Sequence, residues 1–365
     1  MRLCIISNTA SHYRTSIYKL IDETYETEFY FSEPFEDIER MDYAILKRHV
    51  KELKTIRFQK FSYQRGALSL INDKYDKYIT LGDVRSISTW LFLLKAKILR
   101  KPVYVWTHGW YGKESKLETF IKKVFYKLPS GVLLYGNYAK RLMEMNGVNP
   151  FKLSVVHNSL NYSEQLLLRN NMQPSNIYGD YFLNDNQTII FIGRINNRKR
   201  LDLLINALYE LHSRGHKYNL VIVGDGPEKV NLQSLVEEKG LKDYVWFYGA
   251  CYDERRNAEL IYNADLCVTP GDIGLTAIHV LMFGVPVITH NNYSCQGPEF
   301  EAICEGVTGA FYEYGSFESL SNSIFLWMNT HVANREDVRL ECYKEIDLQW
   351  TPYFQLQVIQ SALGK

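Results

Sequence analysis

Short runs of β-branched and aromatic residues alternate with stretches of helical apolar spacing along the 365-residue chain. This alternation predicts parallel strands joined by helices, because a chain that returns to the same edge of a sheet needs a crossover connection. The predicted strands of the first half span residues 2–7, 28–31, 78–81, 103–107, 132–135 and 154–156. After a break, predicted strands span residues 188–192, 220–223, 245–248, 266–269 and 285–289. The sequence therefore predicts an α/β fold with two doubly wound, Rossmann-like sheets.

The break between the two series of strands suggests two domains. Residues 158–187 are rich in asparagine and lack strong apolar periodicity, so we interpret them as the linker. The length of the chain also exceeds one ordinary core and fits two domains of about 150 to 200 residues. Ligands of doubly wound sheets bind beyond the carboxyl ends of the strands. We therefore expect the functional residues on the loops there, in a cleft between two facing domains.

The two halves of the chain carry opposite net charge. Residues 1–165 hold 26 Lys and Arg against 17 Asp and Glu, whereas residues 166–365 hold 16 against 24. A basic first half indicates an anionic partner, usually nucleic acid or a membrane surface. Residues 90–101 and 113–127 mix apolar and basic residues at helical spacing, which is typical of interfacial helices and equally of ordinary surface helices. Because no nucleic-acid-binding module is recognisable, we expect an anionic membrane surface and no nucleic acid.

Cysteine spacing and hydropathy indicate the compartment. The six cysteines form no C-x-x-C pair and no metal-ligand spacing, which predicts reduced thiols in a cytosolic protein. No run approaches the roughly 18 apolar residues that span a bilayer, and the N-terminus begins as a strand without a signal-peptide pattern. We therefore expect a cytoplasmic protein that can lie peripherally on the inner face of the plasma membrane.

Loops of the second half combine glycines with basic residues. After the strand at 188–192, Gly193 turns the chain, and four cations crowd the start of a helix: Arg194, Arg198, Lys199 and Arg200. Cations beside a helix N-terminus bind anions, because the unpaired N–H groups and the helix dipole add to the side-chain charge. Further along, Gly274 allows the backbone to approach a ligand, and Thr276 lies near a helix start. Because no D-x-D pair could hold a divalent ion, these groups predict a diphosphate site without a metal.

Four segments, by their order and spacing, resemble the retaining glycosyltransferases of family 4, which have the GT-B architecture. The segments are FIGRINNRKRLDLLINAL, VIVGDGPE, ADLCVTPGDIGLTAIHVLMFGVPVIT and GPEFEAICEGVTGAF. The resemblance covers nearly the whole chain and is strongest over residues 188–309. It implies an acceptor-side domain of residues 1–165 with a C-terminal helix, 350–365, that packs back on it. Residues 166–349 would then form the nucleotide-sugar-binding domain.

The resemblance places the donor site in the second domain. The Arg and Lys that hold the donor diphosphate in the family correspond to Arg194 and Lys199. The family has a Glu near the donor sugar and a Glu on the ribose, where this chain has Gly271 and His279. His279 can bind a ribose hydroxyl or be a satisfied core histidine, and Asp272 can supply a shifted carboxylate or face solvent. The donor-binding residues implied are Gly193, Gly271, Asp272, Gly274, Leu275, Thr276 and His279.

Two loops of the first half hold further candidates. His108 follows the strand at 103–107 on a loop with two glycines. Family members have a histidine there that touches the donor sugar, so the resemblance implies a catalytic role for His108, Arg194 and Lys199. The loop after the first strand holds residues that would line the acceptor side or would belong to a merely structural turn: His12, Tyr13 and Arg14.

The resemblance implies a retaining transferase that moves a sugar from a nucleotide-diphosphate sugar to a hydroxyl acceptor, with no metal and no cofactor. Because of the basic amphipathic segments, we expect a lipid-linked saccharide acceptor in cell-surface polysaccharide biosynthesis, with a soluble saccharide as the competitor. One alternative is another GT-B enzyme, a nucleotide-sugar epimerase or a phosphorylase. Another is a non-catalytic nucleotide-sugar-binding subunit, which the absent glutamates would favour.

Overall fold

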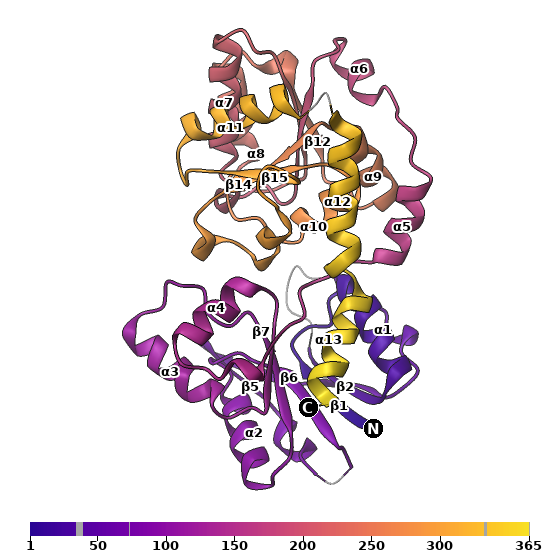
Figure 1. Cartoon of the computed structure of the whole chain (residues 1–365), viewed down its shortest axis with the longest axis vertical. Helices are drawn as coiled ribbons and strands as arrows, with labels where there is room; N and C mark the ends of the chain where they lie inside the picture. The colour runs from indigo at the N-terminus through magenta and orange to yellow at the C-terminus, as the bar shows by residue number, and fades with distance from the viewer. Residues whose placement is uncertain (34–38, 73, 332–333, 365) are drawn as a thin grey trace. The chain divides into compact units, whose positions relative to one another are not determined.

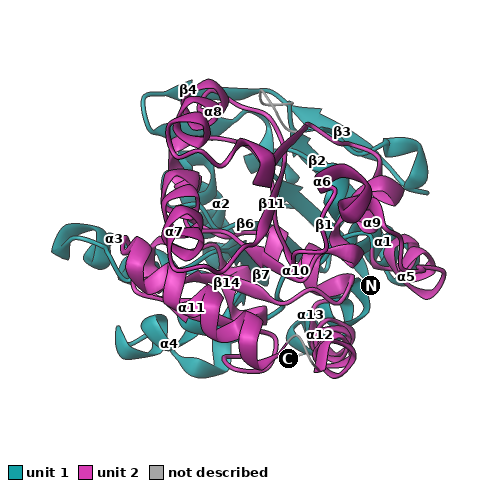
Figure 2. Cartoon of the chain, turned by 90° about the horizontal axis from the view of Figure 1, so that it is seen from above, with its two compact units in different colours: residues 1–161, 351–365 teal, residues 162–350 magenta. Residues whose placement is uncertain are grey.

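The computed structural model describes residues 1–33, 39–72, 74–331 and 334–364 (Figure 1). The chain divides into two compact units (Figure 2). Unit 1 comprises residues 1–161 and 351–365, and unit 2 comprises residues 162–350. Each unit contains its own parallel sheet and its own buried core.

Unit 1 is built on a parallel seven-stranded sheet with the strand order β3-β2-β1-β6-β7-β8-β9. The strands are β1 (Arg2–Ser7), β2 (Glu26–Ser32), β3 (Val50–Leu53), β6 (Lys77–Leu81), β7 (Val103–Thr107), β8 (Gly131–Leu134) and β9 (Leu153–Val155). An antiparallel hairpin outside this sheet pairs β4 (Thr55–Phe58) with β5 (Phe61–Gln64). The predicted parallel sheet is confirmed. β3 and the hairpin were not predicted, because each of these four-residue strands buries at most one side chain and lacks an apolar run.

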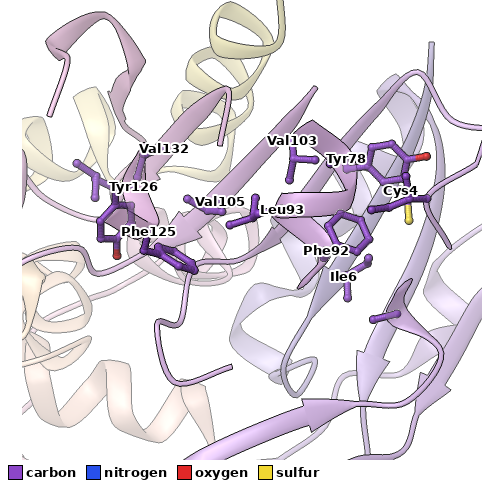
Figure 3. Close-up of a cluster of buried hydrophobic side chains, with 14 of the residues drawn as sticks. Cys4, Ile6, Tyr78, Phe92, Leu93, Val103, Val105, Phe125, Tyr126 and Val132 are labelled. Atoms are coloured by element: carbon purple, nitrogen blue, oxygen red, sulfur yellow. The ribbon is translucent and has the colours of Figure 1, made fainter. Parts of the chain in front are cut away.

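Helices cover both faces of the unit 1 sheet. They are α1 (Thr15–Thr24), α2 (Ile87–Ile98), α3 (Lys116–Tyr126), α4 (Asn137–Met145) and α13 (Pro352–Gly364). One core, under α2, α3 and α4, buries Phe92, Phe125 and Met143. Figure 3 shows Phe92 and Phe125 among its side chains. A second core, under α1 and α13, buries Ile17 and Ile359. Each such side chain contributes about 1.5–3 kcal/mol to the free energy of unfolding, so both faces hold the sheet in place.

Unit 2 is built on a parallel six-stranded sheet with the strand order β12-β11-β10-β13-β14-β15. The strands are β10 (Thr188–Ile192), β11 (Asn219–Val223), β12 (Val245–Gly249), β13 (Leu266–Val268), β14 (Val287–His290) and β15 (Gly309–Tyr312). The helices are α5 (Tyr162–Asn170), α6 (Ile177–Phe182), α7 (Leu201–Ser213), α8 (Lys229–Glu238), α9 (Glu254–Asn263), α10 (Thr276–Met282), α11 (Phe317–Thr330) and α12 (Arg335–Gln349). The second predicted parallel sheet is thus also confirmed. Among the described strands of this sheet, only the edge strand β15 was not predicted.

Residues 158–187, which we interpreted as the linker, contain the boundary between the units at residues 161 and 162 and are partly helical. They include α5 and α6, and α6 buries Tyr178 and Phe182, which lie one helical turn apart. The hydroxyl of Tyr178 donates to the carbonyl of Leu260 at 2.5 Å, which fixes α6 against α9. Two buried side chains are enough to dock a six-residue helix, yet they are too few to stand out as a periodic pattern.

Candidate functional site

Loops at the carboxyl ends of the unit 2 strands are joined by backbone hydrogen bonds. The N–H of Ile195, after β10, donates to the carbonyl of Asp225, after β11, at 2.8 Å. The N–H of Gly271, after β13, donates to the carbonyl of Lys199 at 2.9 Å. Because β11 and β13 flank β10 in the sheet, these contacts make one continuous surface from the three loops.

Gly271 lies where no side chain fits. A Cβ atom at this position would be 1.8 Å from the carbonyl oxygen of Arg198 and 2.7 Å from the Cα of Lys199. The glycine at the family's glutamate position therefore lets residues 271 and 272 run directly against the Arg198–Lys199 backbone. At Gly274, by contrast, a Cβ would meet no atom closer than 3.9 Å.

Two cations of the loop after β10 contact Asp272. The Nζ of Lys199 donates to the carbonyl of Asp272 at 2.6 Å and lies 3.4 Å from its carboxylate, and the guanidinium of Arg198 also pairs with that carboxylate. Arg200 turns instead to Asp202, at 2.9 Å. The structure therefore does not leave Asp272 facing solvent, and it brings Lys199, Gly271 and Asp272 together. Arg194 lies exposed on the same loop.

The turn before α10 contains Gly274 and Leu275, and Thr276 is the first residue of the helix. The hydroxyl of Thr276 donates to the carbonyl of Ile192 at 3.2 Å, which ties the start of α10 to the end of β10. Beside this turn lies the buried carboxyl group of Glu299, 3.9 Å from where a Cβ on Gly274 would be. Pro298 and Glu299 follow each other in the sequence, but no local pattern there predicted that Glu299 would lie beside the candidate site.

His279 has a protein partner inside unit 2. Its Nε2 lies 3.0 Å from a carboxylate oxygen of Glu254 on α9, and Gln165 of α5 donates to the same oxygen at 2.8 Å. Burial raises the pKa of Glu254, but the hydrogen bond and charge of His279 outweigh it, so the pKa is lowered overall. Ionised Glu254 therefore stabilises unit 2 at neutral pH, and this contribution is lost as the pH falls through the lowered pKa. Ribose binding by His279 stays a prediction.

Restoring the family's glutamate with His279→Glu is expected to destabilise unit 2 by about 2 kcal/mol at pH 7, because two carboxylates then face each other. The pKa of one of these two carboxyl groups rises, so the variant loses stability as the pH increases through that raised pKa. Thermal unfolding at pH 5 and pH 7 measures the difference. The double variant His279→Glu/Glu254→Gln should recover most of the loss, and an unchanged melting temperature in the single variant would contradict this pairing.

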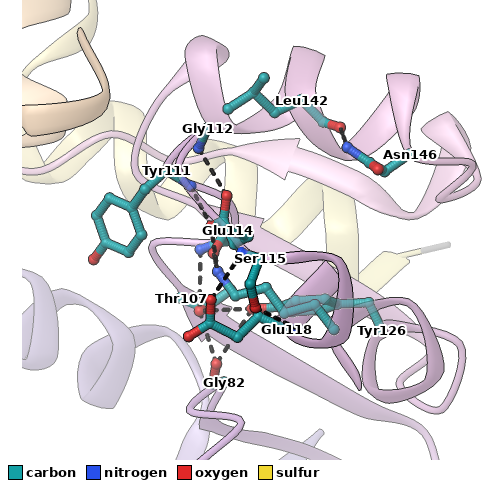
Figure 4. Close-up of polar contacts among 12 residues, drawn as sticks. Gly82, Thr107, Tyr111, Gly112, Glu114, Ser115, Glu118, Tyr126, Leu142 and Asn146 are labelled. Atoms are coloured by element: carbon teal, nitrogen blue, oxygen red, sulfur yellow. Dashed lines mark hydrogen bonds and ion pairs between the residues drawn. The ribbon is translucent and has the colours of Figure 1, made fainter. Parts of the chain in front are cut away.

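In unit 1, an internal carboxylate holds the loop that carries His108. The carboxylate of Glu114 accepts the N–H groups of Tyr111 and Gly112 at 2.7 and 2.9 Å (Figure 4). The Nζ of Lys122 on α3 lies 2.6 Å from Glu114 and donates to the carbonyl of Gly109 at 2.8 Å. Glu114 and Lys122 therefore position this loop. The sequence analysis missed them, although a carboxylate two residues after a Gly turn is the signal that could have found Glu114.

His108 and Arg14 meet around one tyrosine. The ring centroids of His108 and Tyr135 are 4.6 Å apart, and the guanidinium of Arg14 contacts the hydroxyl of Tyr135. Although His108 is partly exposed, the surrounding protein and the charge of Arg14 lower its pKa to about 4. His12 is exposed, with Nδ1 3.9 Å from Glu39, and Tyr13 lies against the guanidinium of Arg14. His108, Tyr13 and Arg14 therefore form one cluster at the carboxyl ends of β1, β7 and β8.

Comparison with known proteins identifies the second half of the chain. Residues 180–343 match the family described as Glycosyl transferases group 1. These residues form a group 1 glycosyltransferase domain. It contains every unit 2 residue that we expected at the donor site, from Gly193 to His279.

Individual relatives are distant. The alpha-D-kanosaminyltransferase of Streptomyces kanamyceticus is 30% identical over 114 residues, covering 30% of this chain and 29% of that protein. The GDP-mannose-dependent alpha-(1-6)-phosphatidylinositol monomannoside mannosyltransferase of Mycobacterium tuberculosis is 28% identical over 154 residues. The alignment covers 40% of this chain and 39% of the mannosyltransferase. The chain thus aligns with less than half of either relative.

Solved structures extend the similarity to the whole chain. The crystal structure of Anabaena Alr3699/HepE in complex with UDP has a TM-score of 0.73, with 15% identity and full coverage of both chains. At this identity the likeness shows the fold alone. The predicted GT-B fold, with two Rossmann-like α/β units, is therefore confirmed.

Proposed function

We propose that the chain is a retaining glycosyltransferase of family 4 that moves a sugar from a nucleoside-diphosphate sugar to a hydroxyl acceptor. The observation that carries this proposal is the contact of Lys199 with Asp272, next to Gly271, within the residues that match the group 1 family. Two contacts to Asp272 fix the Nζ of Lys199. The loop of residues 271 and 272 can lie this close to the Arg198–Lys199 backbone because Gly271 has no side chain. A fixed cation of this kind stabilises negative charge without rearranging during the reaction.

In the proposed reaction the bond from the anomeric carbon to the diphosphate breaks while the acceptor oxygen approaches the same face of the sugar. Arg194 and Lys199 stabilise the charge that develops on the diphosphate, which needs no metal in this proposal. The departing phosphate oxygen takes the acceptor proton, and the sugar retains its anomeric configuration. His108 contacts the donor sugar, while Gly193, Leu275, Thr276 and His279 contribute to the donor site.

A transfer assay tests this function. The purified chain is incubated with UDP-, GDP-, ADP- and CMP-sugars and a panel of saccharide acceptors, with and without EDTA. We expect release of one nucleoside diphosphate, unchanged by EDTA, and a product with the donor's anomeric configuration by NMR. An epimerised donor without acceptor would instead identify an epimerase. Donor binding without turnover would favour the non-catalytic role, with which the internal pairing of His279 is consistent.

A second part of the proposal concerns α3, whose outer face is apolar. Four apolar side chains at helical spacing are exposed on it: Leu117, Phe120, Ile121 and Val124. Leu117 is 68% and Phe120 65% exposed, while Phe125 and Tyr126 of the same helix are buried in the core. These four exposed side chains of α3 therefore do not pack against the sheet of unit 1.

The neighbouring α2 repeats the arrangement. Ile87, Leu91, Leu94 and Ile98 are exposed at the same helical spacing. Trp90 of α2 packs against Phe125 of α3, with ring centroids 5.0 Å apart, so the two helices are adjacent. Within the described residues, no helix is long and apolar enough to cross a bilayer. Because the sequence places several lysines along these helices, the charge complements an anionic membrane surface.

We propose that this face docks on anionic lipid and that the acceptor is a lipid-linked saccharide of cell-surface polysaccharide biosynthesis, at the cytoplasmic side. The variant Leu117→Ser/Phe120→Ser is expected to bind anionic phosphatidylglycerol vesicles at least about tenfold more weakly, because two apolar side chains no longer enter the interface. Cosedimentation at low salt measures this. Leu326→Ser, which changes a leucine 60% exposed on unit 2, is the matched control. Equal binding by all three proteins would contradict docking through α3.

A further inference from the structure

Arg14 is a half-buried cation surrounded by aromatic rings. Its guanidinium carbon lies 5.4 Å from the ring centroids of both Trp106 and Tyr135 and 5.9 Å from that of Tyr13. Its hydrogen bonds go to two phenol oxygens, that of Tyr135 and, at 3.5 Å, that of Tyr18. These partners satisfy part of a group with five N–H donors, and none of them carries a charge.

A counter-ion for this guanidinium is absent from the described part of the chain. No carboxylate there forms an ion pair with Arg14; the carboxylate of Glu39 lies 3.9 Å from Nδ1 of His12 instead. Burial raises the pKa of Tyr135, so its phenol stays neutral and cannot serve as the anion. Lys199 of unit 2, by comparison, has the carboxylate of Asp272 at 3.4 Å. Withdrawing a cation from water without an anion is costly, and no described residue offsets that cost for Arg14, so an anion that binds beside it would be favoured.

Among the described residues, the surroundings of Arg14 supply a further donor and no acidic acceptor. The indole Nε1 of Trp106 is buried and has no hydrogen-bond partner among the residues that the structure describes. An indole donor without a partner, on a ring 5.4 Å from a guanidinium without a counter-ion among the described residues, indicates a ligand rich in acceptor oxygens. The cluster follows β1, β7 and β8, at the end of the sheet where ligands of such folds bind.

We propose that Arg14, with Trp106 beside it, binds an anionic oxygen group, a phosphate or a carboxylate, carried by the acceptor. The assignment of this ligand as the acceptor rests on the proposed function. Anion binding itself does not, because Arg14 belongs to unit 1 and the proposed diphosphate site belongs to unit 2. The acceptor is then a phosphorylated or acidic saccharide rather than a neutral one.

The test compares three proteins that all carry Lys199→Met, so that the unit 2 cation cannot report on the added anion. They are the single variant, the same with Arg14→Met, and the same with Arg141→Met, which removes an exposed arginine of α4 as a control. Each is titrated with inorganic phosphate, a short-chain polyprenyl diphosphate and glucuronate, and is followed by tryptophan fluorescence and melting temperature. A response to the lipid diphosphate alone indicates a lipid-linked phosphate, a response to both phosphates a general phosphate site, and a response to glucuronate an acidic sugar.

Arg14→Met is expected to weaken the anion response about tenfold or more, because it removes a charge-assisted contact, while Arg141→Met leaves it unchanged. Without anion, Arg14→Met is expected to melt at a higher temperature than its parent, since the uncompensated cation is gone. Arg14→Lys, which keeps the charge, should retain a weaker response and guards against a folding defect in the methionine variant. No response to any of the three anions, or an equal response with Arg14→Met, would overturn the proposal even if nucleotide-sugar turnover is found.

Discussion

Replacing Lys199 with methionine is expected to lower kcat for sugar transfer by about a hundredfold to a thousandfold. The loss of one fixed donor to a developing anion costs about 3–4 kcal/mol in such sites. In this structure the ammonium is held by the carbonyl and the carboxylate of Asp272, so its position is fixed before the reaction. Single-turnover assays at saturating donor measure the effect on the chemical step, and a separate titration measures donor affinity.

Two further variants separate this effect from a structural one. Lys242→Met removes an exposed lysine of the same unit and should leave the rate unchanged. Lys199→Arg keeps the positive charge and should retain more activity than Lys199→Met, although the longer guanidinium cannot reproduce both contacts. If Lys199→Met folds normally and transfers sugar at the parent rate, the assignment of the diphosphate site is wrong.

Gly271→Ala is expected to have the largest effect on stability, a loss of about 3 kcal/mol, together with loss of donor binding. The added Cβ would lie 1.8 Å from the carbonyl oxygen of Arg198, so one of the two loops must move. Because Gly271 also donates to the Lys199 carbonyl, a displacement of this loop moves the cation as well. Urea denaturation and a donor titration measure the two consequences.

Gly274→Ala is the matched control, three residues away in the same turn. Its Cβ would meet no atom closer than 3.9 Å, so we expect its stability to stay close to that of the parent protein. Similar losses for both glycines would show that the turn is sensitive to any side chain. That outcome would contradict the specific contact with Arg198.

The buried strands were predictable because each is a short apolar run between turns. β10 and β11, for example, lie within a residue of their expected positions, since both are almost fully buried and contain little besides Ile, Leu, Val and Phe. The elements that were missed bury little. β4 buries no side chain, β5 buries only Gln64, and α6 contributes only two buried side chains. Apolar periodicity reports burial, so it could not find elements that are held by a few specific contacts.

The candidate site was predictable only where residue type itself indicates chemistry. Arg194, Lys199 and His108 are reactive or charged groups after predicted strands, and the structure places each on a loop at the carboxyl end of its sheet. The reason for Gly271 lies in a contact with Arg198, more than seventy positions away in the chain, which no local pattern encodes. The partner of His279 likewise comes from another helix, because Glu254 belongs to α9 and is itself held by Gln165 of α5.

The central claim is that unit 2 binds a nucleoside diphosphate through Lys199, and a thermal-shift titration tests it most directly. UDP, GDP, ADP, CMP and their common sugar conjugates are added to the parent protein, Lys199→Met and Lys242→Met without added metal. At least one diphosphate should raise the melting temperature of the parent protein and of Lys242→Met, as linkage requires, and should leave Lys199→Met unchanged. No stabilisation by any of them, or equal stabilisation of all three proteins, would contradict the claim.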